Sequence, residues 1–146
     1  MSQSLRSGTY LIKNVHSDRY IISSGSDGYL ETKTYPSESV PTSARIRVAV
    51  DEDRLFSLSS TVGDSNLYMA DEWDQSGGFR HAQWNKDGSK WVIEGNGKPG
   101  QYIIKLVDFS LFVKQKTNSE SQEYEPLILT SDCKHSSEAW MFVCSD

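Results

Sequence analysis

The fold is decided by a short stretch near the start of the sequence, Gly8-Thr9-Tyr10-Leu11-Ile12, which recurs twice in modified form. The later copies read Arg54-Leu55-Phe56-Ser57-Leu58 and Gly100-Gln101-Tyr102-Ile103-Ile104. An aromatic residue stands third in each copy, and successive copies are 46 residues apart. Short runs that alternate in this way, separated by turn residues, are typical of β-strands. Self-similarity at a fixed period indicates a protein built from repeats.

Each copy opens a block of similar organisation. After a turn comes a second apolar run, and these three runs are Tyr20-Ile21-Ile22, Leu67-Tyr68-Met69 and Leu111-Phe112-Val113. Each block then closes on an alternation whose apolar residues are Ile46 and Val48, Trp91 and Ile93, and Trp140 and Phe142. In the first block we expect strands at 8–15, 18–22, 29–35 and 44–50. We find no amphipathic helix in the pattern.

The blocks span about residues 8–53, 54–99 and 100–146, so the sequence predicts one domain over residues 1–146. Three units of four strands favour an all-β protein with the β-trefoil fold, in which six strands close a barrel and three hairpins cap one end. A β-sandwich would not need a threefold period, and a propeller would need more chain. The large residues at repeated positions are expected in the core, namely Tyr10, Phe56, Trp91, Tyr102 and Trp140.

Composition narrows the class of protein. The chain has 146 residues, 36% of them hydrophobic, and a net charge of −5, which is the wrong sign for a nucleic-acid partner. It contains no apolar run approaching the ~20 residues that span a bilayer, so we expect no membrane partner. The first residues lack the apolar middle of a secretory signal, so we expect a cytoplasmic protein, or one released by a non-classical route. A homodimer is left open.

Chemical motifs point away from an enzyme. The sequence has no GxSxG, HExxH or GxxxxGK[ST] pattern, so we predict a non-enzymatic protein with no catalytic residues, no metal and no cofactor. His16, His81 and His135 have no metal-ligand spacing and are expected as solvated turn or strand residues. Cys133 and Cys144 are too few for a disulfide framework, and we expect both to be thiols.

Loops are the expected binding elements, because a trefoil holds them rigidly while their sequences vary. One candidate is the turn of Gly25, Ser26, Asp27 and Gly28. A second is the connection with Pro36, Ser37 and Glu38, which its prolines would stiffen. The third is the turn that ends at Asn66, and the fourth is the polar segment that contains Trp73. Trp73 is either a lid folded on the barrel or an anchor for a ligand.

The second repeat also offers a sugar platform. Trp84 and Asn85, with Asp71 or Asp74, could present an aromatic ring to a pyranose face and polar groups to its hydroxyls. Alternation can equally direct Trp84 into the core, and the two interpretations stay open.

The opening stretch 8–15, the three repeats and the final Trp140-Met141-Phe142 resemble small β-trefoil proteins of mushrooms. That group includes ricin-B-like lectins and the protease inhibitors called mycocypins, cospin-like inhibitors and cocaprins. The lectin resemblance implies a QxW signature at the end of each repeat. The corresponding positions read Ala44-Arg45-Ile46, Ser89-Lys90-Trp91 and Glu138-Ala139-Trp140, without the glutamine.

The inhibitor resemblance implies a protease partner of the cysteine or aspartic class. In mycocypins an asparagine in the turn between strands five and six engages asparaginyl endopeptidase, and Asn66 lies in the matching turn. The cospin-like pattern implies a role for the turn of Gly25, Ser26 and Asp27. The main expectation is therefore a loop-mediated protease inhibitor. The alternative is a ricin-B-like lectin that binds glycans, or a lectin-like subunit that has lost sugar binding.

Overall fold

The computed structural model describes residues 5–23, 28–36, 38–62, 67–74, 79–107, 112–115, 125–130 and 139–144. For residues 28–29, 73–74, 79–80, 112–115 and 125–130 the description covers the backbone. The strands are β1 (Gly8–Asn14), β2 (Tyr20–Ile22), β3 (Gly28–Tyr29), β4 (Glu31–Lys33), β5 (Arg45–Val50), β6 (Phe56–Ser60), β7 (Tyr68–Asp74), β8 (Phe79–Asn85), β9 (Trp91–Gly95), β10 (Gln101–Leu106), β11 (Phe112–Gln115), β12 (Glu125–Thr130) and β13 (Ala139–Cys144). One 3₁₀ turn, η1 (Thr42–Ala44), precedes β5.

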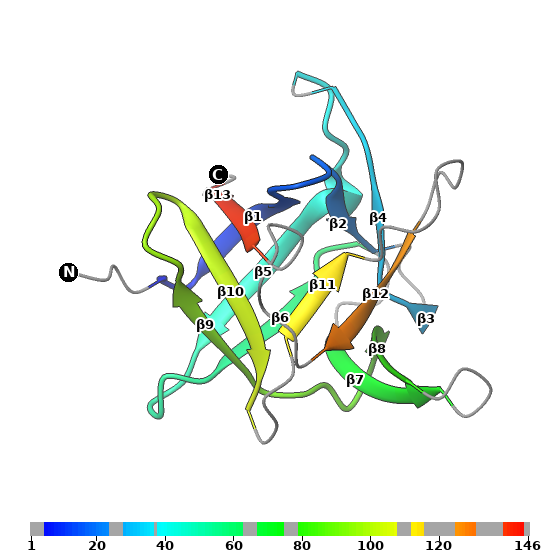
Figure 1. Ribbon diagram of the computed structural model, residues 1–146, viewed down its shortest axis with the longest axis vertical. Coiled ribbons are helices and arrows are strands. Elements are labelled where there is room, and N and C mark those ends of the chain that lie inside the picture. Colours follow the sequence, from blue (N-terminus) through cyan, green and yellow to red (C-terminus); the bar gives the residue numbers. More distant parts are fainter. Residues whose placement is uncertain are drawn as a thin grey trace.

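Six antiparallel strands close a barrel (Figure 1). β1 pairs with β5, β5 with β6, β6 with β9, β9 with β10, and β10 with β13. β13 then pairs with β1, with Tyr10 opposite Cys144. The ring therefore leaves none of these six strands as an unpaired edge.

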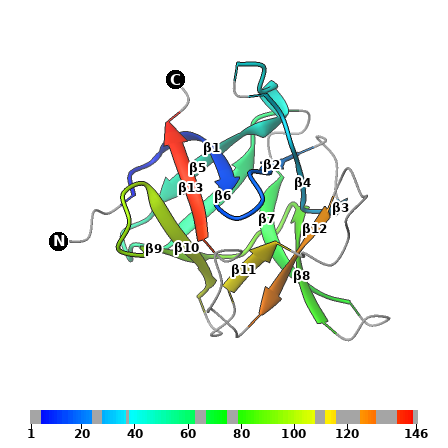
Figure 2. The ribbon, with the colours of Figure 1, turned by 45° about the horizontal axis from the view of Figure 1, so that its top comes forward.

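Three hairpins, β2–β4, β7–β8 and β11–β12, gather on one side of the barrel (Figure 2). They are joined to one another because β12 pairs with both β4 and β8. Equivalent pairs connect each hairpin to the barrel: Lys13 with Tyr20, Ser59 with Tyr68, and Lys105 with Phe112. The barrel members of these pairs are 46 residues apart. This architecture confirms the predicted β-trefoil.

The core follows the same period. Ile12, Leu58 and Ile104, each 46 residues from the next, are fully buried. Trp91 lies opposite Phe56, and Trp140 lies opposite Tyr102. Both indole rings are completely buried, and Phe56 and Tyr102 are buried as well, which agrees with the core predicted for these four positions.

Tyr10 departs from that prediction, because it is only partly buried. Its ring meets Phe142 edge-on at 5.8 Å between centroids, while its hydroxyl donates a hydrogen bond to the carbonyl of Arg6 at 2.8 Å. A tyrosine hydroxyl in the core needs a hydrogen-bond partner. The partner of Tyr10 lies at the exposed edge of the barrel, so the Tyr10 ring is directed toward that edge and stays partly exposed.

The strand predicted over 29–35 is wrong in detail, because the chain forms two short strands there. β3 pairs with β8, whereas β4 pairs with β2. Leu30 lies between them, is fully buried, and donates its backbone N–H to the carbonyl of Ala82 at 2.9 Å. The buried Leu30 lies between the β3–β8 pair and the β4–β2 pair. Its backbone bond to Ala82 connects the first repeat to the second.

Candidate functional site

The candidate site is built around the turn between β8 and β9. Asn85 Oδ1 accepts the backbone N–H groups of Asp87 at 3.0 Å and of Gly88 at 2.8 Å. Gly88 has a positive φ of 70°, and a Cβ added to it would lie 2.8 Å from the Cβ of Tyr68. Asparagine therefore fixes the turn, and glycine lets the turn approach Tyr68 closely.

Three hydrogen bonds join the same turn to β7. Ser89 Oγ donates to Asp71 Oδ1 at 2.6 Å, and it accepts the backbone N–H of Asp71 at 3.1 Å. The backbone N–H of Ser89 donates to the carbonyl of Met69 at 3.1 Å. Hydrogen bonds thus hold the turn at both its start and its end, and they fix the position of its backbone beside β7.

Lys90 joins the turn to the barrel. Its ammonium group donates to Ser57 Oγ at 3.1 Å and lies 3.4 Å from Asp51 Oδ2. Asp51 also accepts the backbone N–H groups of Leu55 and Asp53. The bond from Leu55, followed by that from Asp53 and by Lys90, lowers the pKa of the Asp51 carboxyl below its ordinary value of 3.8. The carboxylate that positions Lys90 is therefore charged at neutral pH.

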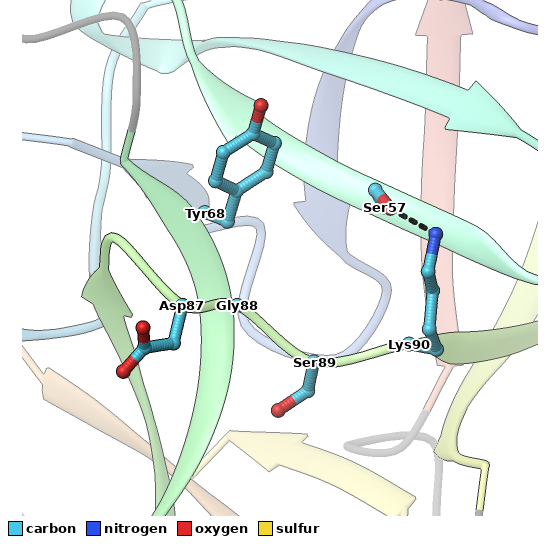
Figure 3. A pocket seen from close by; sticks show the side chains of 6 residues that line it. All are labelled: Ser57, Tyr68, Asp87, Gly88, Ser89 and Lys90. Carbon is cyan, nitrogen blue, oxygen red and sulfur yellow. Dashed lines mark hydrogen bonds between the residues drawn. The ribbon is translucent and has the colours of Figure 1, made fainter.

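These residues surround a pocket of about 340 Å³, lined by Ser57, Tyr68, Asp87, Gly88, Ser89 and Lys90. Figure 3 shows the ring of Tyr68 and the side chain of Lys90 on one side of the turn, with Ser57 directed toward Lys90. The side chains of Asp87 and Ser89 point to the other side of the turn. The pocket thus offers an aromatic face, two hydroxyls and an ammonium group, which are groups for binding a polar ligand.

The first repeat has an equivalent tyrosine that is covered. Tyr20 occupies in β2 the position that Tyr68 occupies in β7, and it is 6% exposed. The ring of Tyr35 lies 6.3 Å from it between centroids, and the Lys13 ammonium lies 5.9 Å from its ring. Tyr68 is half-buried, and among the described residues nothing bonds its hydroxyl. The ring of the second repeat is therefore the more accessible of the two.

The structure corrects the predicted sugar platform. Trp84 is 2% exposed and donates its indole N–H to the carbonyl of Ile22 at 3.1 Å, so it belongs to the core and has no free face. Asp71 and Asn85 are close to the new pocket, but they bond the turn itself. Asp74 and Trp73 lie at the end of β7, where the backbone is described.

The predicted protease-binding residues are spread over several loops. Gly25, Ser26, Asp27, Ser37 and Asn66 lie outside the described residues. Gly28 belongs to β3 and pairs with Trp84.

Pro36 and Glu38 are exposed on the long connection between β4 and β5, which projects from the body of the protein (Figure 1). The backbone N–H of Ser39 donates to the Pro36 carbonyl at 3.0 Å, which makes a tight turn there.

The remaining titratable groups are dispersed. His16 is exposed, whereas His81 in β8 is 4% exposed, so the expectation of a solvated side chain is wrong for His81. Cys144 is an exposed thiol, and Cys133 and His135 lie outside the described residues. Within the described part of the chain no cluster of His, Cys, Asp and Glu could hold a metal ion. No helix of that part is long and apolar enough to cross a membrane.

Comparison with known proteins supports the fold. The chain is similar to the Macrolepiota procera ricin B-like lectin in complex with lactose, with a TM-score of 0.78 and 16% identity over 98% of this chain and 99% of that one. It is similar to the Rhizoctonia solani agglutinin, with a TM-score of 0.75 and 15% identity over 98% and 99%.

A third similar structure is SeviL bound to asialo-GM1 saccharide, with a TM-score of 0.66 and 10% identity over 96% and 99%. No protein-family model and no curated protein matches the sequence. Since identities at this level show the fold alone, the likeness supports the β-trefoil fold and no particular ligand.

Sequence reasoning missed the residues that line the pocket, Tyr68 and Lys90 above all. One signal was present, since Tyr68 stands in the same apolar run of its repeat as Tyr20 and Phe112. The turn residues Asn85 and Gly88 were a second signal. The bond from Lys90 to Ser57, 33 residues apart, depends on barrel closure and leaves no trace in the local sequence.

Proposed function

We propose that this protein is a non-enzymatic carbohydrate-binding protein whose ligand binds the pocket beside Tyr68. The observation that carries the proposal is the accessible ring of Tyr68 beside a turn held in place by Asn85 and Ser89. A tyrosine offers an apolar face to the C–H groups of a pyranose and a hydroxyl to its oxygens. The likeness to trefoil lectins, one of them in complex with lactose, supports the same class of ligand.

The rigidity of the pocket supports this proposal further. The turn loses little freedom when a ligand binds, because its hydrogen bonds to β7 and its own Asx turn already exist in the free protein. The volume of about 340 Å³ is at the lower end of the range for small-molecule sites. A terminal saccharide unit is therefore the expected occupant.

Tyr68→Ala is expected to weaken glycan binding at least tenfold, because it removes the ring on which the sugar would lie. The measurement is a glycan array followed by calorimetric titration with the best ligand. Tyr102→Phe serves as a control, since Tyr102 is buried in the core and a change there should leave affinity within about twofold. The proposal fails if no glycan binds, or if Tyr68→Ala binds as well as the unchanged protein.

We also propose, as a second candidate, that the connection between β4 and β5 blocks a protease. Two backbone bonds stiffen this connection: Ser39 to Pro36 at 3.0 Å, and Ala44 to Pro41 at 3.1 Å. Its base is packed by Tyr35, whose ring lies 5.6 Å from the Lys33 ammonium. A stiff projecting loop can enter a cleft at a low entropic cost.

In a titration of papain and pepsin, the inhibitor proposal expects loss of protease activity at stoichiometric protein. Glu38→Ala, at the exposed turn of the connection, should change the inhibition constant, whereas Lys98→Ser on the β9–β10 turn should not. Full activity of both proteases at high micromolar protein would remove this candidate and leave the carbohydrate proposal intact.

A further inference from the structure

Two arginines lie on the outer face of β5, which is the strand next to the one that carries the pocket residue Ser57. Strand register places Arg47 opposite Ser59 on one side, and Ser59 opposite Tyr68 on the other. Paired residues of adjacent antiparallel strands project from the same face of a sheet. Arg47, Ser59 and Tyr68 therefore form one row across β5, β6 and β7. Two strand spacings, or about 10 Å, separate the backbones of Arg47 and Tyr68.

Among the described residues, the two arginines of β5 have no acidic partner. Arg45 and Arg47 are exposed and lie two residues apart on the outer face of β5. Across the strand pairs, Arg47 faces Thr9 and Ser59, and Arg45 faces Leu11. Within the described ranges, neither guanidinium makes a hydrogen bond or an ion pair with a side chain.

Two lysines of neighbouring segments do have acidic partners. Lys90 lies 3.4 Å from Asp51, and Lys13 lies 3.6 Å from Asp18. The chain as a whole carries a net charge of −5. Arg45 and Arg47 carry like charges on one face of one strand, and an anion bound to both would offset their mutual repulsion.

We propose that the ligand of the Tyr68 pocket is an anionic saccharide, whose acidic group binds Arg47 with Arg45 beside it. This inference rests on the proposed carbohydrate function. The planar guanidinium matches a carboxylate or a sulfate with two parallel hydrogen bonds. Beside the ring, the pocket offers the positively charged Lys90 ammonium group and the hydroxyls of Ser57 and Tyr68, each of which has an O–H that can donate to an acidic oxygen. The Ser57 oxygen already accepts from Lys90, which leaves its own O–H for a ligand.

The test compares three related ligands: lactose, 3′-sialyllactose with a carboxylate, and 3′-sulfated lactose. We expect at least one acidic ligand to bind ten times more tightly than lactose, with an affinity that falls as salt is raised from 50 to 500 mM, because salt screens exposed charges. Arg47→Ser should lower affinity for that ligand about tenfold and change lactose binding less than twofold. Preference for the carboxylate or for the sulfate identifies the acidic group.

Lys98→Ser is the matched control, because it removes one positive charge at the opposite end of β9 from Lys90. It should leave all three affinities within twofold. Equal binding of lactose and both acidic ligands would overturn the inference and leave the carbohydrate function standing. An equal loss of affinity for all three ligands in Arg47→Ser would do the same. Absence of binding to any glycan on an array that contains both neutral and acidic members would overturn both proposals.

Discussion

Replacement of Trp91 by alanine is expected to lower the free energy of unfolding by about 3–5 kcal/mol, as is usual when a fully buried aromatic residue is truncated. The Trp91 ring is completely buried opposite Phe56, and its indole N–H donates to the carbonyl of Met69 at 3.0 Å. The change removes the packing of a whole indole and one of the two hydrogen bonds to the Met69 carbonyl, which keeps the bond from the Ser89 backbone N–H. Since domains of this kind are stable by about 5–15 kcal/mol, most of the stability could be lost.

Urea denaturation followed by far-UV circular dichroism measures this effect. Trp91→Phe keeps an aromatic ring but not the N–H, so it should lower the free energy of unfolding by less than Trp91→Ala does. If the alanine variant does not fold, the phenylalanine variant should still unfold cooperatively and give a measurable value. Val143→Ala, at a side chain 45% exposed, should stay within about 0.5 kcal/mol of the unchanged protein. A loss under 1 kcal/mol in Trp91→Ala would show that the repeated aromatic positions do not support the core.

Replacement of Gly88 by alanine is expected to have the largest effect on the pocket. The new methyl group would lie 2.8 Å from the Cβ of Tyr68, and the backbone of Gly88 has a φ of 70°. Alanine pays about 1–2 kcal/mol for this left-handed conformation, and the clash adds to that. Either the turn or Tyr68 must move, so we expect at least a tenfold loss of glycan affinity together with a loss of stability.

Gly100→Ala separates the two causes. Gly100 has a φ of 74°, but nothing lies within 4 Å of a Cβ added there. It should therefore show the conformational penalty without the clash, and glycan affinity should be unchanged. If Gly88→Ala and Gly100→Ala lose the same stability and both retain full affinity, the close approach of the turn to Tyr68 does not shape the pocket.

The barrel could be predicted from the sequence because its contacts repeat. Tyr10, Phe56 and Tyr102 mark the period, and the strands that begin with these stretches all enter the closed ring. Where a repeat departs from the common pattern, prediction was less successful. The run 29–35 was predicted as one strand, but burial of Leu30 divides it between two neighbours.

The site could not be predicted in the same way. Whether a residue at a repeated position is exposed for binding depends on the side chains that pack over it. Tyr20 and Tyr68 have the same place in the pattern, yet Lys13 and Tyr35 close the first while the second remains accessible. Trp84 shows the converse case, since a tryptophan between two polar residues of the sequence proves to be buried. Exposure of an aromatic ring is a property of the packed neighbours, and those neighbours come from distant parts of the chain.

The closure of the barrel by β13 against β1 also bears on the connectivity of the chain. Tyr10 faces Cys144 across that junction as Phe56 faces Val50 and Tyr102 faces Gly95 across the other two. The strand pairs β13–β1, β5–β6 and β9–β10 therefore have the same place in the barrel. A turn of the chain connects the strands in two of these pairs, and no turn connects β13 to β1. The order in which the repeats are linked is therefore not imposed by the packing, and the architecture is suited to circular permutation.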